Sequence, residues 1–164
     1  MSGSGFHLSE PAFHIVLVRP EIPQNTGSIG RLAAATRSRL HLVGPLGFSL
    51  EDRYLKRAGL DYWPLVDLRF YPTWERFALE HPAERFKYFS ARAERSYLDT
   101  NYERGEWLVF GSETKGLGVE FLRERKDSTF NIPILEPGVR SLNLANAVSI
   151  VLYEGLRQTG LARR

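Results

Sequence analysis

Cysteine is absent from this sequence of 164 residues, and its histidines are few and scattered. Without cysteine the chain can form neither a disulfide nor a thiolate metal site. His7, His14, His41 and His81 show no spacing typical of metal ligands, so we expect no metal cofactor. No apolar run approaches the ~20 residues needed to cross a bilayer, and the first residues lack the basic and apolar regions of a secretory signal. These absences predict a cytoplasmic protein with no membrane partner.

The composition is that of an ordinary globular domain with little excess charge. Hydrophobic residues make up 43% of the chain and charged residues 25%, and the formal net charge is +3. By itself, such a mild charge is weak evidence for a nucleic-acid partner. Residues 1–12 begin with a Ser-Gly alternation and offer nothing to bury, which predicts a flexible N-terminal extension. A single domain is expected over residues 13–160.

Short apolar segments that alternate with helix-like segments predict an α/β fold. The strand-like segments cover residues 13–18, 40–43, 86–91, 107–111 and 129–134. The helix-like segments cover residues 28–38, 51–59, 74–81, 119–126 and 143–158. This alternation is typical of a mostly parallel sheet flanked by helices. Because ligands of such folds bind at the carboxyl ends of the strands, the loops that follow the strands are the candidate sites.

The loop RPEIPQNTGSIGR, residues 19–31, follows the first predicted strand and has two interpretations. Gly27 and Gly30 would let the backbone approach an anion at the start of the next helix. Their spacing is G-x-x-G rather than G-x-G-x-x-G, which speaks against a dinucleotide cofactor such as NAD. In the second interpretation, Asn25 or Thr26 caps the helix and Arg31 is a surface residue. Taken alone, the loop favours this second interpretation.

The segment LVFGSETKGLG, residues 108–118, runs from a strand into a glycine-rich turn. Gly111 and Gly116 allow a tight turn whose backbone is exposed at the edge of the sheet. The carboxylate of Glu113 suits a hydroxyl group or a cation as its ligand. The alternative roles of Glu113 are to cap the following short helix or to pair with Lys115.

The last predicted helix carries two stripes of residues at helical spacing. One stripe is apolar and should face the core: Leu144, Val148, Val151, Leu152 and Leu156. The other stripe lies on another side and suggests burial against a second subunit: Asn143, Asn146, Ile150, Tyr153 and Arg157. Ser141 or Asn143 would serve as the N-cap of this helix.

Taken together and in this order, the three loops resemble those of one known family. The matching stretches are PEIPQNTGSIGRLAAAT, LHLVGPLGF, RAGLDYW, FGSETKGL and IPILEPGVRSLNLANAVSIVLYEGLRQ, and the resemblance spans nearly all of residues 13–158. They resemble the SPOUT superfamily of knotted methyltransferases. Within it, the sequence is most similar to the small tRNA (cytidine/uridine-2′-O-)-methyltransferases, which methylate the ribose of the wobble nucleotide in the anticodon loop.

The resemblance implies a fold, a cofactor and partners. The C-terminal part of the α/β sheet would be threaded as a deep trefoil knot. S-adenosyl-L-methionine would be the methyl donor, with S-adenosyl-L-homocysteine as the product, and no metal would be required. The partners would be the anticodon stem-loop of a tRNA, with C or U at the wobble position, and a second copy of the chain in an obligate homodimer.

The resemblance also assigns site residues by their positions in the matching stretches. Those implied to line the cofactor pocket, largely through backbone groups, are Phe89, Gly111, Ile132, Ser141 and Leu142. Those implied to lie near the transferred methyl group are Arg31, Asn25, Glu113, Ser141 and Asn143. Tyr153 falls where the family has a helix tyrosine near the dimer interface, and we include it among the catalytic candidates.

The chemical role of Arg31 has two versions. The matching arginine of the family is often described as the general base, but a guanidinium group has a pKa above ~12 and does not lose its proton in proteins. Arg31 could instead hold a nucleotide phosphate and stabilise a developing alkoxide. The sequence does not decide between these versions.

Other functions stay open beside the wobble methyltransferase. The nearest is 2′-O-methylation of another tRNA position or of rRNA, and a further one is a non-catalytic RNA-binding module that does not bind S-adenosylmethionine. A nucleotide-binding oxidoreductase is disfavoured by the missing G-x-G-x-x-G. Basic residues that could contact tRNA, or could equally be solvated surface, are Arg53, Lys56, Arg57 and Arg140.

Overall fold

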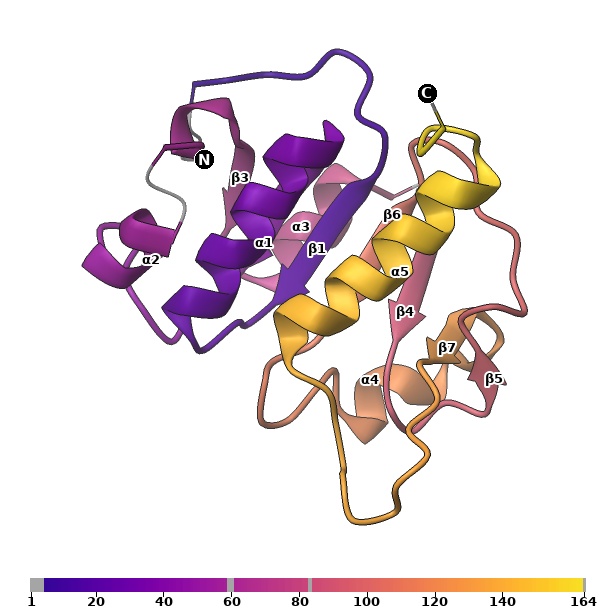
Figure 1. Ribbon diagram of the computed structural model, residues 1–164. Helices are drawn as coiled ribbons and strands as arrows, with labels where there is room; N and C mark the ends of the chain where they lie inside the picture. The colour runs from indigo at the N-terminus through magenta and orange to yellow at the C-terminus, as the bar shows by residue number, and fades with distance from the viewer. Residues whose placement is uncertain (1–4, 59–60, 83, 164) are drawn as a thin grey trace.

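The protein is described by a computed structural model over residues 5–58, 61–82 and 84–163 (Figure 1). The strands are β1 His14–Val18, β2 Arg39–Val43, β3 Asp67–Tyr71, β4 Phe86–Phe89, β5 Arg95–Ser96, β6 Trp107–Phe110 and β7 Thr129–Asn131. The α-helices are α1 Pro23–Thr36, α2 Arg53–Ala58, α3 Trp74–Glu80, α4 Val119–Arg123 and α5 Leu144–Gln158. Two short 3₁₀ helices, η1 Trp63–Leu65 and η2 Lys126–Ser128, lie between these elements.

The strands form one sheet of seven in the order β3-β2-β1-β6-β4-β7-β5, and every neighbouring pair is parallel. The predicted α/β fold with a mostly parallel sheet is therefore confirmed. β1 is flanked by β2 on one side and by β6 on the other, with His14 aligned to both Arg39 and Trp107. The chain builds outward from β1 in both directions, so the loops after β1 and β6 begin side by side. Such a switch point is where an α/β sheet leaves room for a ligand.

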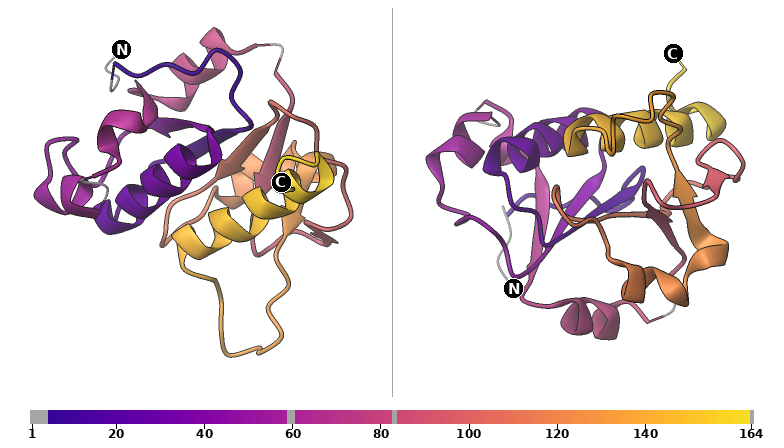
Figure 2. Two further views of the ribbon diagram at one scale, coloured as in Figure 1. Left: turned by 45° about the horizontal axis from the view of Figure 1, so that its top comes forward. Right: turned by 90° about the horizontal axis from the view of Figure 1, so that it is seen from below.

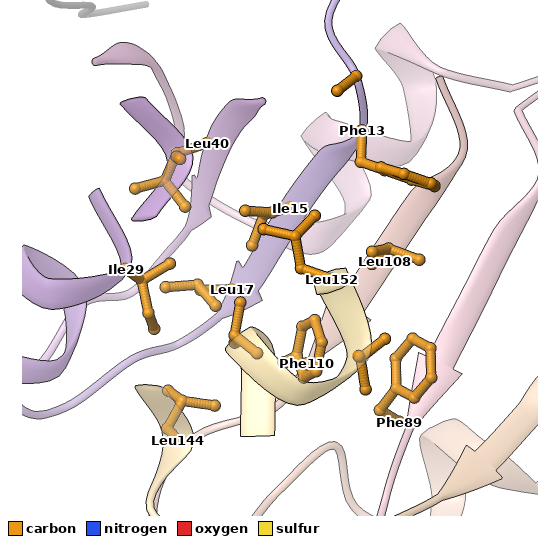
Figure 3. Packing of buried hydrophobic residues seen from close by; sticks show 14 of the residues in the cluster. Phe13, Ile15, Leu17, Ile29, Leu40, Phe89, Leu108, Phe110, Leu144 and Leu152 are labelled. Carbon is orange, nitrogen blue, oxygen red and sulfur yellow. The ribbon is translucent and has the colours of Figure 1, made fainter. Parts of the chain in front are cut away.

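Helices cover both faces of the sheet (Figure 2). α1 and α5 lie side by side on one face, and α3 and α4 lie on the other. Because side chains alternate along a strand, β1 buries Ile15 and Leu17 under α1 and α5 and buries Val16 on the α3 side. Figure 3 shows the first of these clusters, in which Leu152 of α5 packs with residues of the central strands. In the part of the chain described here, every helix is too short or too polar to span a bilayer.

The two stripes of α5 differ in their exposure to solvent. All five residues of the apolar stripe are buried: Leu144, Val148, Val151, Leu152 and Leu156. The other stripe is open to solvent in the single chain, with Ile150 37% exposed and Tyr153 49% exposed. The core prediction for this helix is confirmed, and a surface is left on which a second subunit could pack.

Two strands are not predicted by the sequence pattern. Charged residues interrupt the apolar alternation of β3, yet Asp67 is fully buried because Arg39 and Arg69 lie 2.8 Å and 2.6 Å from its carboxylate. β5 has only two residues, which is too short for any period to show. In both cases the pairing with a neighbouring strand, rather than local composition, decides the conformation.

The first helix begins before the predicted residue 28. α1 starts at Pro23, whose ring suits the first helical position, and its N-cap is Ile22. Asn25 and Thr26 are consequently buried in the first turn. The interpretation of either residue as the helix cap is therefore wrong.

The segment before β1 is packed against the sheet at Leu8. This residue is 5% exposed, and its backbone N–H donates to Oδ2 of the buried Asp67 at 2.8 Å. The expectation that residues 1–12 have nothing to bury is therefore wrong for Leu8, and also for Pro11 and Ala12, which are buried as well. Its partner lies 59 positions away, a distance that no local sequence pattern spans. The flexibility of residues 1–12 stays a prediction.

A row of hydrogen-bonded rings lies on the α3 side of the sheet. His14 Nδ1 is 2.9 Å from His41 Nε2, His41 Nδ1 is 3.1 Å from the Tyr71 hydroxyl, and that hydroxyl is 3.1 Å from His81 Nε2. His14 also stacks on Trp107, with ring centroids 3.8 Å apart. Burial lowers the pKa of His14 to about 3 and lowers the pKa of His41 well below its usual value. Both histidines are therefore neutral in the folded protein near neutral pH.

We expect the protein to lose stability as the pH falls below about 6.5. The folded-state pKa values of His14 and His41 lie below their unfolded-state values, so the unfolded chain binds more protons in this range. Their contribution to the free energy of unfolding is fully present above about pH 6.5. It is lost as the pH falls toward the folded-state pKa, at up to ~1.4 kcal/mol per pH unit for each histidine. Urea unfolding at about pH 7.5 and about pH 5.5 measures the change.

His14→Phe provides the matched variant, because phenylalanine keeps a ring to stack on Trp107 and cannot titrate. Its free energy of unfolding should vary less with pH than that of the wild type, whatever its absolute value. Equal wild-type free energies of unfolding at the two pH values would contradict the prediction.

Candidate active site

Glu113 joins the loops that follow β1 and β6 at the carboxyl edge of the sheet. Its carboxylate accepts hydrogen bonds from the backbone N–H groups of Glu21 at 2.9 Å and Ile22 at 2.7 Å, and from Nδ2 of Asn25 at 3.2 Å. The first N–H groups of a helix have no partner inside it, and the N-cap of α1 provides no side-chain hydrogen bond. Glu113 supplies this capping from 91 positions downstream, and its charge suits the positive end of the helix dipole.

A second contact locks the same two loops together. The hydroxyl of Thr114 donates to Oε1 of Glu21 at 2.6 Å, and the Thr114 N–H points to the same oxygen at 3.3 Å. The hydroxyl bond lowers the pKa of the Glu21 carboxyl. Glu21 and Thr114 are absent from the sequence-based site, and the sequence signal that could have found them is their place in the loops after two neighbouring strands.

Asn143 brings the third loop to the other two. Its Oδ1 accepts from the backbone N–H of Asn146 at 3.2 Å, so Asn143 is the N-cap of α5, as one of the two predicted caps. Its Nδ2 donates to Oδ1 of Asn25 at 3.0 Å. Asn25, 8% exposed, thus donates to Glu113 and accepts from Asn143, which fixes the orientation of its amide.

A cavity of about 650 Å³ opens beside Glu113 at the same edge of the sheet. This volume lies in the range of pockets that hold small molecules, about 300–1,000 Å³. The turn after β6 forms one wall, the loop after β4 another, and the loop between β7 and α5 a third. All five predicted cofactor residues line the cavity: Phe89, Gly111, Ile132, Ser141 and Leu142.

The wall at Gly111 is made of backbone in close contact with backbone. Ser112 and Gly116 exchange two backbone hydrogen bonds, at 3.2 Å and 2.9 Å, which closes the turn. A Cβ atom at Gly111 would overlap the carbonyl carbon of Gly116 and the nitrogen of Leu117. Gly116 has a φ of +61°, a conformation that glycine adopts readily. Glycine is required at 111 for this turn to close beside the cavity.

Two of the predicted catalytic residues do not reach this network within one chain. Arg31 lies six residues after Asn25 on α1, which places it about 9 Å farther along the helix and roughly 120° around it. Tyr153 lies ten residues after Asn143 on α5, about 15 Å along that helix. Both side chains are exposed. The single chain thus assembles Asn25, Glu113 and Asn143 and leaves Arg31 and Tyr153 on the surface of α1 and α5.

The structure also tests the alternative roles of Glu113 and locates the basic residues that are candidates for contact with tRNA. Glu113 does not cap the following short helix, because the N-cap of α4 is Gly118 and provides no side-chain hydrogen bond. Nor does Glu113 pair with Lys115, because no ion pair joins them within the described residues. Both alternative roles of Glu113 are therefore wrong. Arg140 lines the cavity, whereas Arg53 and Arg57 are exposed on α2. The side chain of Lys56 lies outside the described part of the chain.

The sequence is similar to those of known proteins over most of its length. Residues 12–153 match the SpoU rRNA Methylase family. The tRNA (cytidine(34)-2′-O)-methyltransferase of Saccharophagus degradans is 44% identical over 151 residues, which cover 92% of this chain and 97% of that protein. The protein of the same name from Burkholderia pseudomallei is 43% identical over 152 residues, which cover 90% of this chain and 96% of the relative.

Solved structures share the fold. One, described as giving structural insights into the 2-OH methylation of C/U34 on tRNA, is 47% identical and superposes with a TM-score of 0.85 over 93% of this chain and 97% of its own. The SpoU methyltransferase AviRb from Streptomyces viridochromogenes, in complex with the cofactor AdoMet, is 25% identical with a TM-score of 0.77 over 92% of this chain and 62% of its own. The parallel sheet, the three joined loops and these matches together establish that the chain belongs to the SpoU rRNA Methylase family.

Proposed function

We propose that the protein transfers a methyl group from S-adenosyl-L-methionine to the ribose 2′-hydroxyl of the wobble nucleotide, C or U, in a tRNA anticodon loop. The observation that carries the proposal is the cavity at the carboxyl edge of the sheet. Glu113 borders this cavity, and its carboxylate accepts a hydrogen bond from Asn25. The names of relatives that align over nearly their whole length support the choice of substrate. The SpoU family match supports the reaction type.

The cavity suits S-adenosylmethionine in size and in the character of its lining. Phe89, Ile132 and Leu142 offer apolar surface, while the closed turn at Gly111 presents backbone polar groups. Apolar walls with a few fixed polar groups are typical of cofactor sites. When bound, this cofactor supplies a methyl group already activated on a sulfonium, so the protein need only align the acceptor oxygen and ease the loss of its proton.

Glu113 would organise the site rather than take the proton. Its two carboxylate oxygens already accept hydrogen bonds from the N–H groups of Glu21 and Ile22 and from Asn25. A carboxylate engaged in this way has little capacity left as an acceptor for a ribose hydroxyl. Its function would be to hold Asn25 and the start of α1 in place beside the cavity.

Arg31 would act as a fixed positive charge. A guanidinium group keeps its proton in proteins, so removal of the ribose proton by Arg31 is unfavourable. The same group binds phosphate oxygens in its plane and stabilises a developing alkoxide. Arg31 would therefore grip the wobble nucleotide and lower the energy of the transition state electrostatically.

A homodimer would bring Arg31 to the reaction. In one chain Arg31 is exposed on α1, about 9 Å along the helix from Asn25, and Ile150 and Tyr153 leave the outer stripe of α5 open. Two copies that pack through α1 and α5 would cover this stripe and would offer Arg31 of one copy to the cavity of the other. The trefoil knot implied by the family is expected in the same C-terminal region, and the role in tRNA modification implies a cytoplasmic location.

The proposal is tested by binding and then by product analysis. Calorimetric titration should give saturable binding of S-adenosylmethionine and none of NADH. With a tRNA transcript and the methyl donor, mass spectrometry of nuclease fragments should place a 2′-O-methyl group on nucleotide 34. Methylation of an rRNA fragment or of another tRNA position instead would assign the alternative substrate, and tRNA binding without binding of the methyl donor would favour a non-catalytic RNA-binding protein.

A further inference from the structure

Among the residues that the structure describes, Arg31 has one contact that restrains its charged group. Its guanidinium carbon lies 4.7 Å from the centroid of the Tyr62 ring, within the ~6 Å range of cation–π attraction. Within the described residues, no hydrogen bond or ion pair is made by the Arg31 side chain. A long arginine side chain on an exposed helix face has many rotamers, so the Tyr62 ring is what limits them here.

Tyr62 is held at this place by the packing of its neighbour. Trp63 packs against the main core, and its Cζ3 atom would lie 3.0 Å from a Cβ added at Gly30, so the indole rests directly on the α1 backbone. The carbonyl of Tyr62 also accepts the N–H of Leu65 at 2.8 Å in η1. Gly30 thus admits Trp63, and Trp63 places Tyr62 beside the next residue of α1, Arg31.

We infer that Tyr62 is a positioning residue that holds the Arg31 guanidinium for contact with the RNA ribose-phosphate. This inference rests on the proposed function of Arg31. A guanidinium that lies over a ring by its carbon keeps the N–H donors at its edge free. Those donors are the groups that bind phosphate oxygens, so the ring restrains Arg31 without occupying the atoms it uses.

The test compares Tyr62→Leu with Tyr62→Phe in steady-state methylation of tRNA. Phenylalanine keeps the aromatic face and should leave kcat/KM for tRNA within about twofold of wild type, whereas leucine should lower it about tenfold. Binding of S-adenosylmethionine, measured by calorimetry, should be unchanged in both variants. That measurement also reports whether each variant is folded.

Tyr54→Leu is the matched control. Tyr54 is 40% exposed and Tyr62 39%, and Tyr54 lies against Arg53, with the guanidinium carbon 4.8 Å from its ring centroid, rather than against Arg31. It should lower kcat/KM by less than Tyr62→Leu does. An equal effect of the two leucine variants would overturn the special role of Tyr62.

A double-variant cycle separates positioning from direct contact with an RNA base. If Tyr62 acts through Arg31, Tyr62→Leu should weaken tRNA binding when Arg31 is present. In an Arg31→Ala background the same substitution should cause no further loss of tRNA binding. The same loss in both backgrounds would mean that the ring itself stacks on a base, and wild-type kcat/KM in Tyr62→Leu would mean that it does neither. Either result overturns the inference and leaves the proposed function intact. The proposed function itself fails only if the wild-type protein does not methylate tRNA.

Discussion

Arg31→Ala should reduce methyl transfer to tRNA by at least ~100-fold while cofactor binding is preserved. Arg31 is exposed on α1, and the only described contact of its charged group is with the Tyr62 ring, so its removal leaves no buried group unpaired. Its loss removes the proposed positive charge near the 2′-oxygen and nothing from the cavity lining. Single-turnover methylation measures the rate, and calorimetry with S-adenosylmethionine measures the binding.

Arg31→Lys divides the two proposed contributions of the side chain. Lysine keeps the charge but lacks the planar set of donors, so a partial rate would point to charge and a rate as low as that of alanine would point to paired hydrogen bonds. Arg76→Ala is the control, because Arg76 is exposed on α3 at the opposite face of the sheet, where it pairs with Glu80. Near-normal turnover of Arg31→Ala would contradict the assignment of Arg31 to the reaction.

Gly111→Ala should abolish measurable binding of S-adenosylmethionine. The added Cβ would overlap backbone atoms of Gly116 and Leu117, and backbone cannot move aside as a flexible side chain can. The turn that Ser112 and Gly116 close would have to open, and the wall of the cavity would be displaced with it. Calorimetric titration and thermal unfolding of the same sample measure the effect on the pocket and on the fold.

Gly138→Ala is the matched control for this substitution. Gly138 also lies in a loop, and a Cβ there would meet only the end of the Glu136 side chain, at 3.2 Å. Its cofactor affinity should stay within about threefold of wild type, because the contact is with a flexible group. Normal binding of S-adenosylmethionine by Gly111→Ala would show that the cavity beside Gly111 is not the cofactor site.

Features of the fold that depend on residues close together in the chain are the ones that the sequence predicts. The apolar stripe of α5 repeats at helical spacing within one helix, and every member is buried as predicted. The order of strands and helices was largely predicted as well, because each apolar run carries its own period. β3 was missed because its charged residues are buried only through ion pairs with Arg39 of a neighbouring strand and with Arg69.

The candidate site shows the same division. The five residues assigned to the cofactor pocket by family resemblance all line one cavity, although they come from three separate parts of the chain: the end of β4, the turn after β6 and the loop between β7 and α5. Their roles in binding stay predictions until a cofactor is titrated. Glu21 and Thr114 were missed because a hydrogen bond between residues 93 positions apart leaves no mark on the local pattern of either loop.

By itself the sequence determined the α/β class, the buried face of the last helix and the three loops that carry the family motifs. These features depend on residues close together in the chain, where hydrophobic spacing and turn residues act directly. Only the tertiary structure decided that Glu113 caps α1, that Asn25 is an interior helix residue bonded to Glu113 and Asn143, and that Tyr62 covers Arg31. Each of these contacts joins residues that become neighbours only when parallel strands end at one edge of the sheet and helices pack across it.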